Sequence, residues 1–250
     1  MLSHGDLRIE PSQEILEASR RWLAAPRAAL GHEFLAAYLT GSVLTQGFDT
    51  RHSRVNVLVV ARSLPSDVLD ALAQALDNGR KAPRFDPLFL TRRQIEKSLD
   101  SFPIEWLEIQ ERHLRLEGED VFGGLDVPRT YLRLQCEHEL RGKHIQLRQA
   151  YLASYKHPAE LEATLGASAS SFLALFRTLL RLRGEAPPAD STRVIERISD
   201  LFQLDAQALL TAHLLRHSER RWKPAEIVDA YRAFLGAIDR LVNAIDELTL

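Results

Sequence analysis

Hydrophobic and polar positions divide the chain into a first half of mixed pattern and a second half of helical pattern. In the first half, apolar residues recur every three or four positions after Ser12, which predicts a helix capped by that serine. Two short apolar runs, residues 34–40 and 55–60, predict buried strands. A second helix is expected to begin at Ser66, and a third strand is expected at residues 87–90.

The end of the first half carries weaker signals. Thr91 and Gln94 have the spacing of a capping box, so a short helix is expected to begin there. Residues 104–109 (IEWLEI) predict a fourth strand, with a helix as the alternative. Gly123 and Gly124 end this half. The alternation of helices and strands predicts an α/β architecture.

The second half predicts helices almost throughout. Pro128 and Pro158 stand where helices are expected to begin, because the missing proline N–H costs nothing in a first turn. Two shorter helices are expected between residues 194 and 217, and Pro224 opens the last one. In that last helix apolar residues recur at intervals of three and four from Ile227 to Leu248, which is typical of the seam of a packed bundle.

Composition limits the class of protein and its compartment. A net charge of −2 over 250 residues gives no electrostatic reason to expect a nucleic acid or an anionic membrane as partner. The single cysteine, Cys136, excludes an internal disulfide and any zinc site built on two cysteines of one chain. The first residues lack the apolar run of a signal peptide, and no uninterrupted apolar stretch reaches about 18 residues. We therefore expect a cytoplasmic protein without a membrane partner.

The candidate chemistry lies in residues 38–60, YLTGSVLTQGFDTRHSRVNVLVV. A predicted strand ends at Thr40 and is followed directly by Gly41 and Ser42. Glycine permits a tight turn, and the Ser42 hydroxyl with the free N–H groups of a following helix can hold phosphate oxygens. Gly-Ser pairs also occur in ordinary turns, so the dipeptide alone leaves a purely structural role open.

This segment resembles the pattern of the nucleotidyltransferase superfamily, of the aminoglycoside-modifying and minimal kinds. In that pattern a strand ending in Gly-Ser is followed, after a short spacer, by a strand that carries Asp-x-Asp. Here the spacer runs from Val43 to Arg54, and residues 53–59 match the family's Ser-Asp-h-Asp-h-h-Val except at its two acids. Arg54 stands at the first acid position and Asn56 at the second.

The resemblance implies a nucleotidyltransferase-like α/β (α+β) domain, a mixed sheet with helices, over residues 1–126. An all-α helical bundle domain would follow over residues 127–250. It also implies a third carboxylate on a further strand, for which Glu105 or Glu108 is the candidate. Residues 116–120 (LEGED) resemble a later Leu-x-Gly segment of the family.

On the first helix of the bundle, the resemblance suggests Glu139 as a base and Lys143 as a phosphate contact. The two lie four residues apart and therefore share a helix face. The same spacing is that of an exposed ion pair worth only about 0.3–0.5 kcal/mol. Arg133 and His138 also loosely resemble the Arg and His of helical-bundle toxin ribonucleases that accompany minimal nucleotidyltransferases.

The departures at Arg54 and Asn56 weigh against ordinary catalysis. Nucleotidyl transfer uses Mg²⁺, a hard cation held by carboxylates, to bridge phosphate oxygens. Asn56 offers only a neutral oxygen, and Arg54 brings a positive charge to the place of the metal. Arg54 can instead bind phosphate directly, or lie in solvent beside a vestigial pocket. We expect no resident metal, and Mg²⁺ with ATP or another NTP only if the chain is active.

Three functions stay open on the sequence. The first is a catalytically degenerate protein that binds a nucleotide or a small phosphorylated ligand. The second is an active transferase with rearranged acids. The third is a non-enzymatic, toxin–antitoxin-like interaction module that pairs with itself as a homodimer or with another protein. The residues assigned to phosphate binding are Thr40, Gly41, Ser42, Arg54, Asn56 and Lys143, and those assigned to catalysis are Glu105, Glu108 and Glu139.

Overall fold

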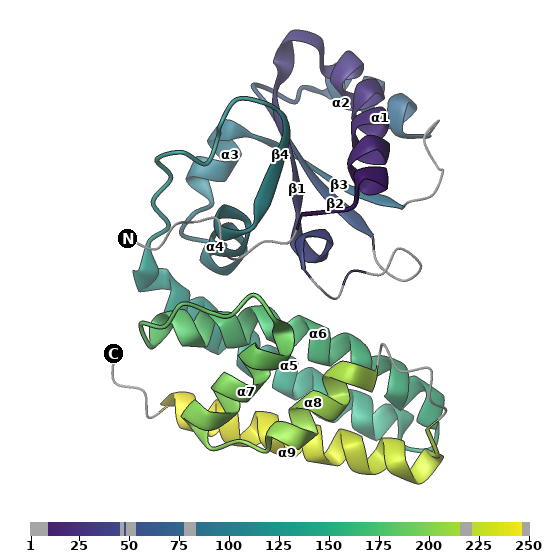
Figure 1. The fold of residues 1–250 in the computed structure, drawn as a ribbon, viewed down its shortest axis with the longest axis vertical. Coiled ribbons are helices and arrows are strands. Elements are labelled where there is room, and N and C mark those ends of the chain that lie inside the picture. The colour runs from purple at the N-terminus through teal and green to yellow at the C-terminus, as the bar shows by residue number, and fades with distance from the viewer. Residues whose placement is uncertain (1–9, 46–47, 49–53, 78–83, 216–221, 247–250) are drawn as a thin grey trace. The chain divides into compact units, whose positions relative to one another are not determined.

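The structure, a computed structural model, describes residues 10–45, 48, 54–77, 84–215 and 222–246 (Figure 1). Contacts divide the chain into two compact units, Met1–Pro128 and Arg129–Leu250. Most of the spacer between Thr45 and Arg54 lies outside the described residues, as does Leu248 at the end of the expected seam.

Within the described residues, the first unit contains a sheet of four strands in the order β3-β2-β1-β4. β1 is antiparallel to both β2 and β4, and β2 is parallel to β3, so the sheet is mixed as predicted. The strands are β1 Phe34–Thr40, β2 Val55–Ala61, β3 Phe85–Thr91 and β4 His113–Gly118.

Helices cover both faces of this sheet (Figure 1). They are α1 Gln13–Leu30, α2 Ser66–Asp77, α3 Arg92–Lys97 and α4 Pro103–Glu111. Alternate residues of β2 point to opposite faces, so Val57 and Val59 pack under α1 and α2 while Leu58 packs toward α3 and α4. Because both faces are buried, β2 is apolar at every position except Asn56.

The caps of two helices follow the sequence expectation. The Ser12 side chain accepts a hydrogen bond from the N–H of Ile15, 3.4 Å away, at the start of α1. Thr91 and Gln94 form the expected reciprocal capping box at the start of α3.

The fourth strand lies elsewhere than expected. Residues 104–109 form the middle of α4, so the predicted strand is wrong and its helical alternative is right. Pro103 opens this helix in its first turn, where it costs no hydrogen bond. The fourth strand is β4, in which Leu114 and Leu116 alternate with polar residues and pack on the α1 and α2 side.

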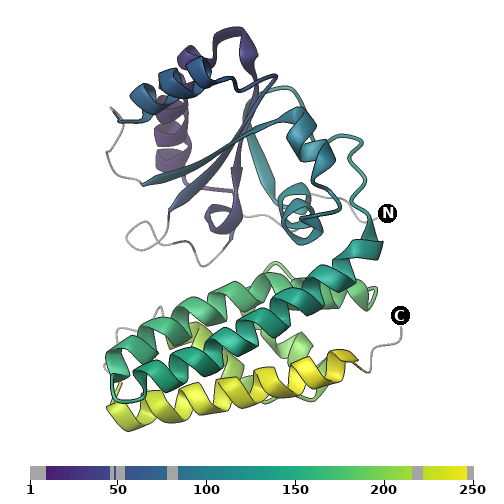
Figure 2. The same cartoon turned by 180° about the vertical axis from the view of Figure 1, so that it is seen from behind.

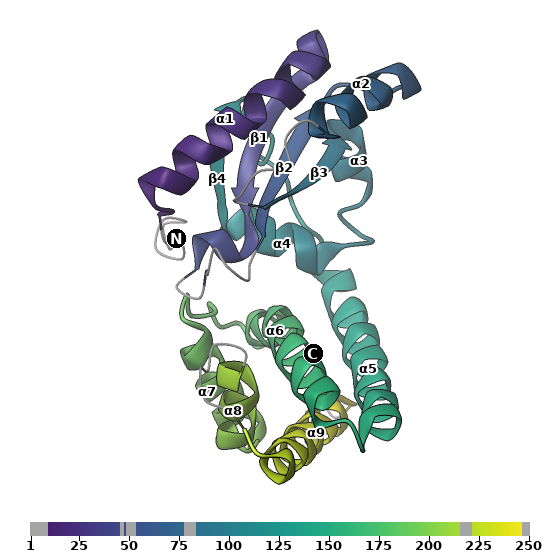
Figure 3. The ribbon, with the colours of Figure 1, turned by 90° about the vertical axis from the view of Figure 1, so that its right-hand side faces the viewer.

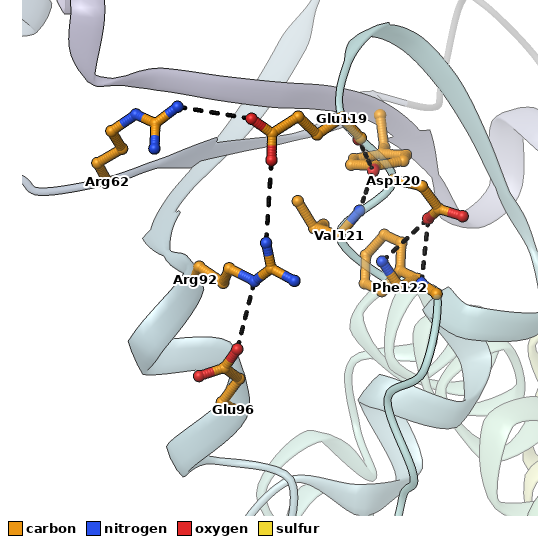
Figure 4. A network of polar contacts seen from close by, with 9 residues as sticks. Arg62, Arg92, Glu96, Glu119, Asp120, Val121 and Phe122 are labelled. Carbon is orange, nitrogen blue, oxygen red and sulfur yellow. Dashed lines mark hydrogen bonds and ion pairs between the residues drawn. The ribbon is translucent and has the colours of Figure 1, made fainter.

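The segment after β4, which includes Glu119 to Phe122 (Figure 4), is held against the sheet by the buried phenol of Tyr38. The Tyr38 hydroxyl donates to the carbonyl of Glu119 at 2.6 Å and accepts from the N–H of Val121 at 2.9 Å. The Asp120 carboxylate accepts from the N–H groups of Phe122 and Gly123, at 3.1 Å each. These bonds fix the path of the chain as it leaves the sheet.

Gly118 makes this exit geometrically possible. Its φ is +90°, and a Cβ there would lie 2.1 Å from the carbonyl oxygen of Leu35 on β1. Only glycine fits so close to the neighbouring backbone. Residues 116–120 (LEGED) are therefore the end of β4 and the first residues that follow this strand.

The second unit is helical in all its described elements (Figure 2). Its helices are α5 Arg129–Ser154, α6 Pro158–Leu182, α7 Ser191–Phe202, α8 Ala206–Leu215 and α9 Pro224–Asp246. Among described helices, α6 alone is long and apolar enough to cross a membrane, and 61% of its most apolar window is buried. It packs against all four other helices of the unit, so it is the core helix of the bundle.

The seam of α9 is used inside this bundle. Its apolar residues from Ile227 to Ile245 are at most 3% exposed at the seam positions. Phe234 packs edge-on against Phe172 of α6, with ring centroids 5.7 Å apart, and the Tyr231 hydroxyl donates to the carbonyl of Leu147 at 2.9 Å. These residues of α9 therefore belong to the core of the bundle, and they are not a free surface for pairing with another protein.

We predict that Tyr38→Phe lowers the free energy of unfolding by about 1–3 kcal/mol, because it leaves the buried N–H of Val121 without its acceptor. Urea denaturation measures this loss. Tyr131→Phe is the matched control, since the Tyr131 side chain is 47% exposed, and it should change stability by less than about 0.5 kcal/mol. Equal stability of Tyr38→Phe and wild type would contradict the bracing role of this hydroxyl.

Candidate functional site

The turn after β1 is built on a glycine that two constraints require. Gly41 has φ +74°, a backbone conformation that costs other residues energy. A Cβ at Gly41 would also lie 2.8 Å from the side-chain Nδ2 of Asn56. The Asn56 amide thus lies against the Gly41-Ser42 turn.

The helix expected after Gly-Ser is only a single 3-10 turn, η2 Gly41–Leu44. The carbonyl of Ser42 accepts from both the N–H and the hydroxyl of Thr45, at 3.0 and 2.8 Å. Ser42 itself is exposed. So short a turn provides almost no helix dipole, and any phosphate site here depends on individual side chains and N–H groups.

One row of polar residues crosses the sheet at this end. Thr40 is in register with Asn56 on β2 and with His113 on β4, and Asn56 is in register with Asp86 on β3. Residues opposite one another in neighbouring strands project to the same face. The row therefore brings one hydroxyl, one amide, one imidazole and one carboxylate to a single face of the sheet.

The Arg54 side chain extends to Asp86, the acidic residue at the β3 end of this row. Its guanidinium Nη1 lies 3.5 Å from Oδ1 of Asp86, and both side chains are well exposed, at 62% and 57%. Asp86 is absent from the residues predicted from sequence. β3 begins at Phe85, two residues before the predicted strand, and the alternation of FDPLFLT is the signal that assigns Asp86 to the face of Asn56.

Glu105 and Glu108 are not on a strand. Both lie on α4, where Glu105 is exposed in the first turn and Glu108 pairs with the buried Arg112 of the same helix. The prediction that Glu105 or Glu108 lies on a strand, as a third acid would, is therefore wrong. Asp86 is the carboxylate that the sheet aligns with Asn56.

Glu139 and Lys143 lie on α5 in the second unit. Lys143 Nζ is 3.7 Å from Glu139 Oε2, so they form the i,i+4 ion pair that their spacing also allows. Lys143 additionally lines a hollow of about 170 Å³ between α5 and α6, with Gln146, Thr164 and Ser168 among its other residues. Their assigned roles as base and phosphate contact stay predictions.

A larger hollow that sequence reasoning missed borders the row at β4. It has a volume of about 310 Å³ and is lined by Tyr38, His113, Leu114, Arg115 and Asp120. The His113 ring stacks edge-on against Tyr38, with centroids 5.3 Å apart, and its Nδ1 is 2.9 Å from the carbonyl of Ile109. Since a carbonyl only accepts, Nδ1 carries the proton. Burial raises the pKa of the Tyr38 phenol, which stays neutral.

The polar side chains of the row do not provide the ligands that a pair of catalytic magnesium ions requires. Among the residues that the structure describes, no group of three or more His, Cys, Asp or Glu side chains could hold a metal. Asp86 is one carboxylate and Asn56 one neutral amide, whereas Mg²⁺ in nucleotidyl transfer is held mainly by carboxylates. Arg54 also neutralises the carboxylate that is present.

Comparison with solved structures gives an informative likeness. No family model and no curated protein matches the sequence. Among solved structures, the chain is similar to the spectinomycin adenyltransferase of Enterococcus faecialis, whose crystal structure holds ATP and spectinomycin. The TM-score is 0.57, with 89% of this chain and 98% of the other covered. The fold is nucleotidyltransferase-like. At 12% identity the likeness confirms the predicted fold class, and it shows the fold alone.

We predict that Gly41→Ala destabilises the protein more than Gly124→Ala, by about 1 kcal/mol or more. Both glycines have positive φ, so both lose about 1–2 kcal/mol of backbone preference. Only Gly41 would press its new methyl group on another side chain, because nothing lies within 4 Å of the corresponding position at Gly124.

The double variant Gly41→Ala/Asn56→Ala separates the two causes. Chemical denaturation of wild type, both single variants and the double variant should show that removing the Asn56 side chain recovers part of the Gly41→Ala loss. Strictly additive losses would mean that Asn56 does not lie against the turn.

Proposed function

We propose that this protein binds a nucleotide or another phosphorylated small ligand at the Gly41-Ser42 turn, without ordinary two-metal nucleotidyl transfer. In this proposal Arg54 and Asn56 occupy the places of the two family acids. The observation that carries it is the contact of Asn56 with Gly41 beside the Arg54–Asp86 ion pair. The nucleotidyltransferase-like fold supports the choice of ligand class.

Electrostatics favour direct phosphate binding over metal binding. A divalent cation about 4 Å from the Arg54 guanidinium is repelled by about 8 kcal/mol at an effective dielectric near 20, before solvent screening. A phosphate is attracted to the same group, and the planar guanidinium matches two of its oxygens. Thr40, Gly41 and Ser42 would add hydroxyl and N–H donors from the turn.

We predict that the protein binds ATP in isothermal titration calorimetry whether or not Mg²⁺ is present, with the two dissociation constants within about threefold of each other. Arg54→Ala should weaken binding by about 10- to 100-fold, because a charge-assisted bond contributes roughly 1.5–3 kcal/mol. Absence of binding in both conditions would overturn the proposal.

Arg62→Ala is a closely matched control. Arg62 is 59% exposed and its Nη2 lies 3.5 Å from Oε1 of Glu119, values close to those of the Arg54–Asp86 pair (Figure 4). It follows the other end of β2, away from the turn. Equal loss of ATP binding in Arg54→Ala and Arg62→Ala would mean that Arg54 acts only through its contribution to the net charge and does not contact the ligand.

A second candidate is an active transferase that uses Asp86 as its carboxylate. The register of Asp86 with Asn56 favours it, since a carboxylate does lie at the row. It predicts Mg²⁺-dependent transfer of labelled AMP from ATP to a hydroxyl compound, and spectinomycin, the ligand of the similar structure, is the first acceptor to try. Asp86→Asn should then abolish transfer, whereas it should leave metal-independent binding intact in the first proposal.

A further inference from the structure

Large apolar side chains gather on the outer side of α5. Figures 2 and 3 show this helix along the outside of the helical unit, and its packing partners there are α6 and α9. The exposed apolar residues on or directly after it are Tyr131, Leu134, Ile145, Leu152 and Tyr155, with exposed fractions from 47% to 78%. We call these five residues the α5 stripe.

The stripe has the spacing of a coiled-coil seam. Its members fall at a and d positions of a heptad repeat that runs from Tyr131 to Tyr155, and His138, Arg141 and Arg148 fill the positions between them. Another side of α5 faces the core of the bundle. Its buried residues there are Leu132, Cys136, Leu140, His144 and Leu147.

Gly142 is a second reason to expect a neighbour along this helix. A glycine in the middle of a 26-residue helix destabilises it relative to alanine. Apart from its own helix and chain neighbours, no described atom lies within 4 Å of the place of its Cβ. Gly142 flanks the stripe near its midpoint, where the missing side chain lets another backbone approach closely.

We propose that the α5 stripe pairs with the same stripe of a second copy of this chain, with the two helices antiparallel. The sequence of the stripe is self-complementary about position 143. Leu134 of one copy then lies opposite Leu152 of the other, and Tyr131 lies opposite Tyr155. Such a contact is isologous and closes as a two-fold dimer.

The charges fit the antiparallel arrangement and oppose the parallel one. Antiparallel pairing brings Glu137 to within one residue of the level of Arg148 of the second copy. Arg148 occupies one of the seam positions, and its ion pair with Asp239 of α9, at 2.7 Å, holds its side chain in place. In a parallel pair, Arg141 and Arg148 would each face its own counterpart, which is repulsive.

The same charges argue against a lipid surface as the occupant. Glu137, Arg141 and Arg148 lie at or beside the middle of the stripe, so no continuous apolar face is available for burial in a bilayer. From Tyr131 to Tyr155 the stripe is about 36 Å long at roughly 1.5 Å per residue. A contact of this length between two helices is modest, and we expect a dissociation constant on the order of micromolar.

Analytical ultracentrifugation of the full chain over about 1–200 µM tests the proposal. We expect the weight-average mass to rise from 28.3 kDa toward twice that value with concentration. Leu134→Lys and Leu152→Glu should each abolish the rise. Leu214→Lys is the matched control, because Leu214 is also exposed, at 54%, but lies on α8 and should leave association unchanged.

Mixing the two disruptive variants, Leu134→Lys and Leu152→Glu, tests the register. In a mixed antiparallel pair, the introduced lysine of one chain meets the introduced glutamate of the other at one end of the seam. The two native leucines meet at the other end, so association should return. Circular dichroism and thermal melting of each variant alone establish that both are folded.

A strictly monomeric wild type, or association that Leu134→Lys leaves intact, would overturn the dimer. Failure of the mixture to associate would overturn its antiparallel register.

Discussion

The contact of the Asn56 amide with Gly41 is the constraint on which the candidate site depends. The Asn56 amide lies so close to the turn between β1 and β2 that a side chain at Gly41 would have to displace it. The sheet register then aligns Asp86 with Asn56, and Arg54 reaches that carboxylate. A polar row exists at this end because four strands, each with one polar residue at this level, are held within one sheet. The proposed ligand chemistry depends on this alignment more than on any single residue.

The parts of the fold that sequence predicted well are those whose two faces are both buried. β1 and β2 are apolar except at Thr40 and Asn56 because helices cover each side, and no helical pattern competes with such short runs. Residues 104–109 mix buried and exposed positions without a clear period, so strand and helix could not be separated. β3 is an edge strand with exposed Asp86 and Leu88, which hid its first residues and the carboxylate. The hollow at β4 depends on register between strands, which local pattern does not carry.

The two heptad-like helices of the bundle illustrate a different limit. α9 and α5 both repeat apolar residues at intervals of three and four, and the repeat of α9 is the stronger in sequence. Burial separates them. The apolar repeat of α9 packs against α5, α6 and α8 within one chain, whereas α5 has a second apolar side that is exposed. An apolar repeat predicts that a helix packs against another element. Only the three-dimensional structure shows whether that element belongs to the same chain.

The buried thiol on α5 has a practical consequence. Cys136 is the only cysteine of the chain and is 1% exposed, and burial raises the pKa of its thiol to about 12, so almost no thiolate exists at neutral pH. Alkylating reagents can reach it only when the bundle opens. The rate at which the native protein is alkylated therefore measures the opening equilibrium of the helical unit separately from that of the sheet. The alkylation rate of Cys136 therefore reports local unfolding of the helical unit.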